Sequence, residues 1–188
     1  VAERADWSPA HVAKILKECD VDMISEKLAA LCKEYRKKDL SEKQYAYVVS
    51  YLRFAHPRDA DPILETLLSE SIRMEVLISC LRLVRSKSSL PGIRKLLLDE
   101  RWQLRMFAIM AIERFGLRED IELLKNHLND DNWWVRYYAA QALLTMPDMN
   151  TESIKKLTSE VETEFEKDIL QQVLAEAEFR CNTQSSTI

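Results

Sequence analysis

The chain has 188 residues, of which 47% are hydrophobic and 31% charged, and its net charge is −4 at pH 7. This length fits one domain with a sizeable core, and the hydrophobic content excludes an intrinsically disordered chain. The acidic balance argues against a nucleic-acid partner, because proteins that hold phosphates need a strongly basic groove.

Glycine and cysteine usage excludes several kinds of site. The two glycines, Gly92 and Gly116, cannot form a phosphate loop or a dinucleotide-binding turn. The four cysteines form no C-x-x-C pair and match no zinc spacing. We therefore expect reduced thiols and a cytoplasmic location, either alone or as the soluble part of a larger or membrane-anchored protein. Because the chain begins with Val1, we expect a fragment of something longer.

Helical periodicity runs along the whole chain, and strict apolar–polar alternation over the length of a strand is absent. Breakers such as "HPRDADP", "SLPG" and "MPDMNTES" separate amphipathic segments. Capping residues mark several starts: Ser41, Asp131 or Asn132, and Thr151. The expected helices cover residues 9–19, 22–37, 41–55, 60–69, 71–86, 91–99, 102–115, 118–129, 132–146, 151–160 and 163–180.

One sequence pattern recurs at a spacing of 31 residues. "DERWQLRMFAIMAIERF" at 99–115 is echoed by "DDNWWVRYYAAQALLTM" at 130–146. A shift of 30 aligns a further segment at 60–86, although Glu75 stands there in the arginine column and Leu81 in an alanine column. Each unit reads as helix, short turn, helix. A fixed period of this length is typical of stacked helical repeats, in which neighbouring units bury each other's apolar faces.

The pattern resembles the HEAT repeat family. The resemblance is carried by a turn aspartate, a V/L-R pair and an A-x-x-A-L/I run: Asp99, Leu104-Arg105 and Ala108 to Ile112, then Asp130, Val135-Arg136 and Ala139 to Leu143. It implies an all-α, right-handed superhelix of helix pairs. The expected organisation is one domain over 1–180, with atypical helices at 1–55, three clear repeats at 60–146, capping helices at 151–180 and a flexible tail at 181–188.

The resemblance also suggests structural roles for two conspicuous sets of residues. In HEAT repeats, arginines in the position of Arg105 and Arg136 pair with turn aspartates of an adjacent repeat, which argues against an anion site. Trp102 and Trp133 recur at one repeat position, which favours packing between repeats over ligand stacking. We expect His127, in the column of Leu96, to be a partly buried packing residue.

A row of soft and apolar residues lies opposite the buried face of each second helix, and in this family second helices line the concave surface. The row comprises Arg73, Val76 and Cys80, then Gln103, Met106 and Met110, then Trp134, Tyr137 and Gln141. This row is either an exposed groove for a partner or a surface covered by neighbouring helices.

The charges are unevenly distributed along the chain. Residues 73–118 carry 10 basic and 4 acidic groups, whereas residues 119–188 carry 6 basic and 14 acidic groups. This basic block fits an acidic partner segment or a solvated surface.

We therefore predict a non-catalytic scaffold or adaptor domain that binds a protein on its concave face, with no metal and no cofactor. The predicted partner-binding residues are Met106, Met110, Trp134, Tyr137, Gln141, Arg73, Arg82 and Arg114. Two alternatives are an enzyme subunit resembling the HEAT-repeat bilin lyases, which hold a tetrapyrrole, and a nucleic-acid-binding HEAT-like protein.

Overall fold

The computed structural model describes residues 25–30, 32, 41–70 and 73–185, with side chains as far as Arg180. The predicted helix at 9–19 and most of the one at 22–37 lie outside these residues. The chain divides into two compact units, residues 1–89 and 90–188. The described residues form helices and no strand, which confirms the all-α expectation.

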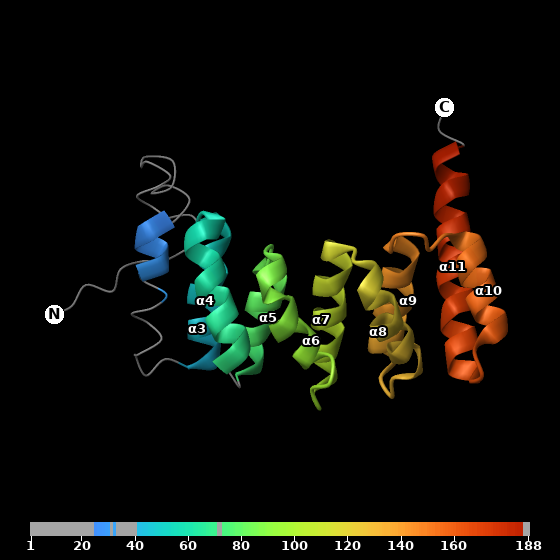
Figure 1. Cartoon of the computed structure of the whole chain (residues 1–188), viewed down its shortest axis with the longest axis horizontal. Helices are drawn as coiled ribbons and strands as arrows, with labels where there is room; N and C mark the ends of the chain where they lie inside the picture. Colours follow the sequence, from blue (N-terminus) through green and yellow to red (C-terminus); the bar gives the residue numbers. More distant parts are fainter. Residues whose placement is uncertain (1–24, 31, 33–40, 71–72, 186–188) are drawn as a thin grey trace. The chain divides into compact units, whose positions relative to one another are not determined.

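In its described residues the first unit holds three longer helices, α3 (Glu42–Ser50), α4 (Pro57–Glu70) and α5 (Met74–Leu83) (Figure 1). Short 3-10 segments follow two of them, η1 (Tyr51–Phe54) and η2 (Lys87–Ser89). Both α3 and α4 pack against α5, and η2 packs against α4. Residues 25–30 are also helical, and Leu28, Ala29 and Cys32 are buried. The core of this unit therefore surrounds α5.

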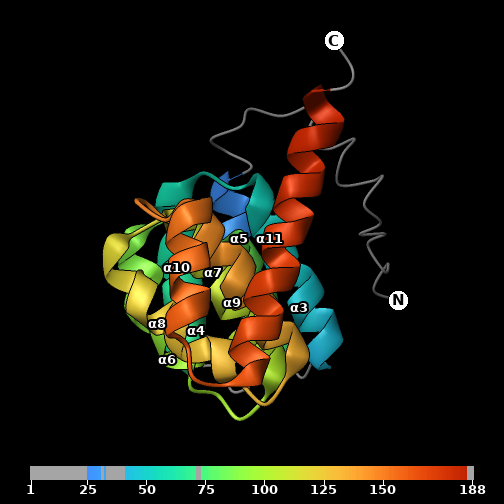
Figure 2. The same cartoon turned by 90° about the vertical axis from the view of Figure 1, so that its right-hand side faces the viewer.

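The second unit contains three helix pairs joined by short turns (Figure 1). The first is α6 (Leu90–Leu96) with α7 (Trp102–Phe115), and the second is α8 (Ile121–Asn126) with α9 (Trp133–Thr145). The 3-10 segments η3 (Arg118–Asp120) and η4 (His127–Asn129) flank α8. The third pair is α10 (Thr151–Glu160) with α11 (Glu164–Ser185), and α11 projects beyond the end of α10 (Figures 1 and 2). Thus α11 runs through 181–185, the first part of the segment expected to be a tail.

Local sequence signals account for the helix ends. Ser41 caps α3 in a capping box with Gln44, and the Asn132 side chain accepts a hydrogen bond of 2.9 Å from the Trp134 amide at the start of α9. Asn150, rather than Thr151, caps α10. Helix α7 ends at Gly116, whose φ of 57° is left-handed and favours glycine. Because α5 spans only Met74–Leu83, the predicted helix at 71–86 is too long.

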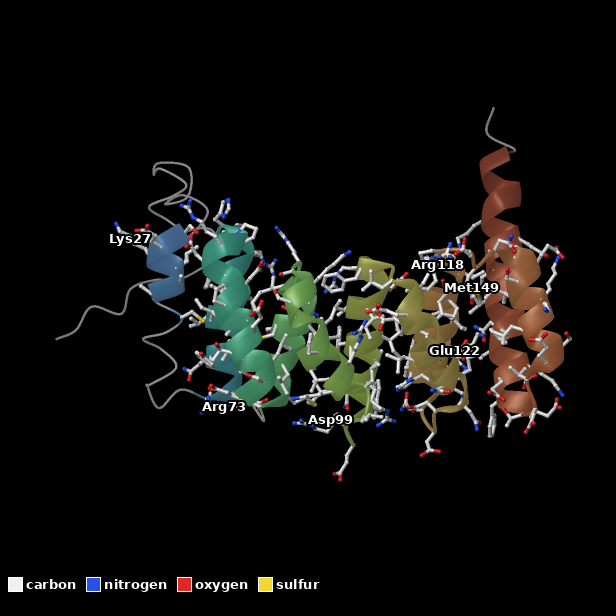
Figure 3. All side chains as sticks on the ribbon, viewed as in Figure 1. Lys27, Arg73, Asp99, Arg118, Glu122 and Met149 are labelled. Carbon is white, nitrogen blue, oxygen red and sulfur yellow. The ribbon has the colours of Figure 1, made fainter. Side chains whose placement is uncertain are left out.

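The repeat spacing of 31 residues is visible in the core of the second unit. The alanines Ala108 and Ala139 are fully buried, as are the preceding Leu104 and Val135. Two contacts show that α7 and α9 run parallel: Arg105 reaches Asp130 at one end, and Thr145 Oγ1 lies 3.3 Å from Glu113 Oε1 at the other. Figure 3 shows the turns at opposite ends of the unit, with Asp99 at one end and Arg118 and Met149 at the other.

Candidate protein-binding surface

Arg105 joins two neighbouring repeats. Its Nε and Nη2 atoms each donate a hydrogen bond of 2.7 Å to the Asp130 carboxylate, and its Nη1 donates to the Asp99 carbonyl oxygen at 2.8 Å. The hydrogen bonds to Asp130 raise the pKa of the Arg105 guanidinium, while burial acts against them. Both charges are therefore already paired, which confirms the structural role predicted for Arg105 and excludes it as an anion ligand.

A second ion pair links α6 to η3, the segment that precedes α8 in the next repeat. Arg94 Nε donates to Asp120 Oδ1 at 2.8 Å, and Arg94 Nη2 donates to Glu119 Oε1 at 2.5 Å. These two bonds raise the pKa of the guanidinium, the one to Asp120 having the larger effect. Together with Arg105 and Asp130, Arg94 fixes the register between the repeat at 91–115 and the repeat at 118–146.

Arg136 does not bind a carboxylate of a following repeat, so the expected pairing with a turn aspartate is wrong for this residue. Its Nη1 donates to the Asp130 carbonyl oxygen at 2.6 Å, as Arg105 does to Asp99. The position 31 residues after Asp130 is Val161, which has no charge to offer. The guanidinium instead lies 4.9 Å from the centre of the Phe165 ring on α11. A cation–π contact takes the place of the next ion pair.

Aromatic rings cluster at the amino-terminal end of α9. The Trp133 and Trp134 rings meet edge to face with centroids 4.8 Å apart, and Trp133 stacks on Tyr137 at 5.1 Å. Trp133 is 39% exposed and Trp134 is 49% exposed. The prediction that Trp133 packs between repeats is therefore wrong. Trp133 lies two residues before the buried Val135, and on a helix this spacing places its ring at the edge of the core.

Tyr137 and Gln141, which follow Trp134 on the same side of α9, are bound to α11. The Tyr137 hydroxyl donates to Glu176 Oε2 at 2.8 Å, and Gln141 Nε2 donates to the same oxygen at 3.1 Å. Desolvation and the Glu176 carboxylate, in that order, raise the pKa of the tyrosine. An open depression of about 530 Å³ lies here, lined by Tyr137, Ala175, Glu176, Phe179 and Arg180. One end of the predicted row is thus partly covered by α11.

The sequence did not predict that side chains of α11 contact α9, because α11 lacks the alanines of the repeat pattern. Leu170 stands 31 residues after Ala139, and Val173 stands 31 residues after Ala142. Both are buried, so the spacing continues although the alanines do not. Had apolar character alone been aligned, α11 would have been recognised as the next second helix, with Glu176 and Phe179 as neighbours of α9.

The predicted binding residues fall into two groups. Six belong to the second unit, with Met106, Met110 and Arg114 along α7 and Trp134, Tyr137 and Gln141 along α9. Met106 and Met110 are half-buried, and Arg114 is exposed. Helices α7 and α9 pack side by side, and we call these six residues the α7–α9 surface.

Arg73 and Arg82 belong to α5 of the first unit, where Arg73 precedes the helix and Arg82 lies in its last turn. Both are exposed, and the Arg73 guanidinium lies 5.9 Å from the centre of the Tyr45 ring. The neighbouring members of the predicted row, Val76 and Cys80, are fully buried, so the row does not extend over α5. Burial, followed by the nearby Cys32, raises the pKa of the Cys80 thiol.

The described residues give no sign of a metal centre or a membrane-spanning helix. No three His, Cys, Asp or Glu side chains among them gather closely enough to hold a metal ion. None of the helices described is both long and apolar enough to cross a bilayer. His127 is buried between two backbone carbonyls, with Nδ1 2.7 Å from the Leu123 oxygen and Nε2 2.9 Å from the Leu97 oxygen, which confirms its predicted packing role.

Comparison with known proteins agrees with the arrangement of the helices. The family model for HEAT repeats matches residues 60–144, which include α5 to α8 and most of α4 and α9. No curated protein matches the chain. The stacked helix pairs, the buried alanines at a spacing of 31 residues and the arginine–aspartate pair between repeats lie within the matched segment. Residues 60–144, somewhat less than half of the chain, are therefore similar to HEAT repeats.

Proposed function

We propose that the chain is a protein-interaction module that binds an extended segment of a partner along the α7–α9 surface. HEAT repeats are generally protein-interaction scaffolds, and their fold is typically non-catalytic. The observation that carries the proposal is the exposure of Trp134. This side chain is 49% exposed although it directly precedes the fully buried Val135, and large aromatic side chains dominate the energetics of interfaces.

The surface combines an apolar anchor with a positive charge. Trp134 lies in the first turn of α9, and Arg114 lies in the last turn of the parallel helix α7. The repeat alignment places Arg114 opposite Thr145, eleven residues beyond Trp134, which at 1.5 Å per residue is about 16 Å along the helix axis. An extended segment of about five residues spans that distance. Met106 and Met110 lie between the two ends, and flexible thioethers accommodate varied apolar side chains.

This arrangement defines the chemistry of the partner segment. An aromatic or branched apolar side chain would pack on Trp134, and a carboxylate about five residues away would face Arg114. The Tyr137–Gln141–Glu176 hydrogen bonds hold the far edge of the surface rigid, so little ordering entropy is lost on binding. Because Arg114 is exposed, its charge would influence the association rate more than the affinity.

Site-specific photo-crosslinking in cells tests this proposal. A benzophenone amino acid at position 134 or position 106 should yield a covalent adduct with the same partner. The control position is Glu122, which is exposed on α8 in the layer of first helices (Figure 3). Trp134→Ala should then weaken binding of the identified partner by about 30-fold, which corresponds to the 2 kcal/mol typical of an anchor. Adducts formed equally at position 122 would refute the α7–α9 surface.

A further inference from the structure

Ser88 lies in an exposed basic segment of the first unit that the proposed interaction surface does not use. It is the middle residue of η2, which connects to α5 through the non-helical residues 84–86. Arg82, Arg85 and Lys87 precede it, and all three are exposed. Its neighbour Ser89 is only 3% exposed, and the Ser89 hydroxyl is enclosed by protein. Ser88 is therefore the accessible hydroxyl next to a run of positive charge.

The Ser88 hydroxyl makes a specific contact with α4. Its Oγ donates a short hydrogen bond to Glu65 Oε1, and it lies 2.5 Å from the Ser86 Oγ. Further charge surrounds Glu65: desolvation and then the Glu65 carboxylate raise the pKa of Asp61, which the nearby Arg85 lowers. The packing of η2 on α4 therefore depends on a neutral hydroxyl that donates a hydrogen to an already acidic site.

From these contacts we propose that Ser88 is a phosphorylation site for a serine kinase that selects basic residues upstream, with Arg85 at the third position before the serine as the main determinant. Kinases distinguish substrates by such charge patterns. In the transfer, Ser88 Oγ attacks the γ-phosphorus of ATP, and the bond from that phosphorus to the bridging oxygen of ADP breaks. The hydroxyl proton passes to the catalytic aspartate of the kinase.

Phosphorylation of Ser88 would replace its attractive hydrogen bond to Glu65 on α4 with electrostatic repulsion. The modified serine no longer has a hydrogen to donate, and it carries a charge of about −1.5 to −2 at pH 7. Glu65 would then face like charge at hydrogen-bond distance, with Asp61 close by. The exposed Arg85 and Lys87 would attract the phosphate, but Glu65 is the charged group at hydrogen-bond distance from the Ser88 oxygen. The modification therefore releases η2 from α4 immediately before the boundary between the two compact units at Ser89 and Leu90.

The site is tested by incubating the full chain with ATP and the catalytic subunit of cAMP-dependent protein kinase, followed by mass spectrometry of peptides. The expected product carries one phosphate on Ser88. Ser88→Ala should abolish this incorporation, Arg85→Ala should slow it by about tenfold or more, in line with a lost charge contact to the kinase, and Ser86→Ala should leave it in place. Phosphate on Ser86 or Ser89, or a rate independent of Arg85, would overturn the assignment.

The structural consequence has its own test in the phosphorylated protein. Its thermal midpoint should fall by about 2–4 °C relative to the unmodified chain, the shift expected for the loss of a stabilising contact worth about 1 kcal/mol in a chain of this size. In the matched variant Glu65→Gln, phosphorylation should lower the midpoint by less than half as much, because the opposing carboxylate is absent. An equal fall in both proteins would refute the repulsion between phosphorylated Ser88 and Glu65.

Discussion

The Arg105 guanidinium and the Asp130 carboxylate form two parallel hydrogen bonds of 2.7 Å across the boundary between two repeats. The pair is largely shielded from water, since the arginine side chain is 16% exposed and the aspartate side chain 8% exposed. Asp130 also accepts the Asn132 amide at 2.9 Å and so fixes the turn before α9. One carboxylate thus serves both the turn and the junction between repeats.

Asp130→Ala should lower the free energy of unfolding by about 3 kcal/mol, because it leaves the Arg105 guanidinium without its partner in a shielded position. Urea denaturation monitored by circular dichroism measures the change. The matched control is Glu160→Ala, which removes the exposed ion pair with Lys156 and should cost less than about 1 kcal/mol. Equal effects of the two substitutions would show that the pair between repeats contributes no more than a surface pair.

The same pair predicts a dependence of stability on pH. Burial acts to raise the pKa of Asp130, but the hydrogen bonds from Arg105 and the Asn132 amide outweigh it and hold the pKa below its ordinary value of 3.8. A carboxylate whose pKa is lowered by folding stabilises fully above its unfolded value, and this stabilisation is lost as the pH falls through the folded value. The wild-type chain should therefore lose more stability between pH 5 and pH 3 than Asp130→Asn. Parallel curves would contradict the assignment.

Ala139→Leu should destabilise the chain by about 1–3 kcal/mol, because the alanine is fully buried in the second unit and extra carbon atoms overpack such a site. Thermal and urea unfolding both report the change. Ala175→Leu is the control, since Ala175 is exposed on α11 and offers room for a larger side chain. A melting temperature unaffected by leucine at position 139 would contradict the close packing of the repeats.

Gly116→Ala should cost about 1–2 kcal/mol, because the glycine has a φ of 57° and a β-carbon is disfavoured in the left-handed region. Apart from the glycine and its neighbours in the chain, no atom lies within 4 Å of the position of an added β-carbon, so the cost arises from the backbone and not from a clash. Gly116→Asn separates these causes: asparagine is larger but tolerates this backbone conformation, and should cost less than alanine. A larger loss with asparagine would point to crowding.

Trp134→Ala should change the free energy of unfolding by less than about 1 kcal/mol, because half of the side chain already faces solvent. Val135→Ala, one residue further along α9 and fully buried, should cost about 2 kcal/mol. Chemical denaturation of both variants tests the contrast. If Trp134→Ala were the more destabilising change, the tryptophan would belong to the core and the anchor proposed on the α7–α9 surface would be lost.

Local and periodic features of this fold could be predicted from the sequence. The spacing of 31 residues placed Arg105 and Asp130 in neighbouring turns. The helix signals placed the cap of α9 at Asp131 or Asn132, and Asn132 is the residue that caps it. Both depend on a few residues close in the chain or in repeat register. For the same reason, the buried side of α9 followed from its 3.6-residue periodicity, with Val135 and Ala139 in the core.

Features that depend on the next layer of helices could not be predicted. Arg136 was expected to find a carboxylate, but Val161 occupies that column and Phe165 receives the guanidinium instead. The partial covering of Tyr137 required knowing that α11 presents Glu176 to α9. The repeat spacing predicts which positions correspond between repeats. The exposure of a side chain also depends on which residues the adjacent repeat has at the positions that face it.

The hydrogen bonds of Arg94, Arg105 and Arg136 show how the junctions between consecutive repeats differ. A chain ending after Phe115 would leave the Arg105 and Arg94 guanidinium groups without their carboxylate partners, which belong to the next repeat. A chain ending after Met146 would leave Arg136 with its carbonyl partners at Asp130 and Asp131. The junction between the repeat of α6 and α7 and the repeat of α8 and α9 is therefore held by charged pairs, whereas the junction between α9 and α11 is held by the Phe165 ring and by the hydrogen bonds of Tyr137 and Gln141 to Glu176.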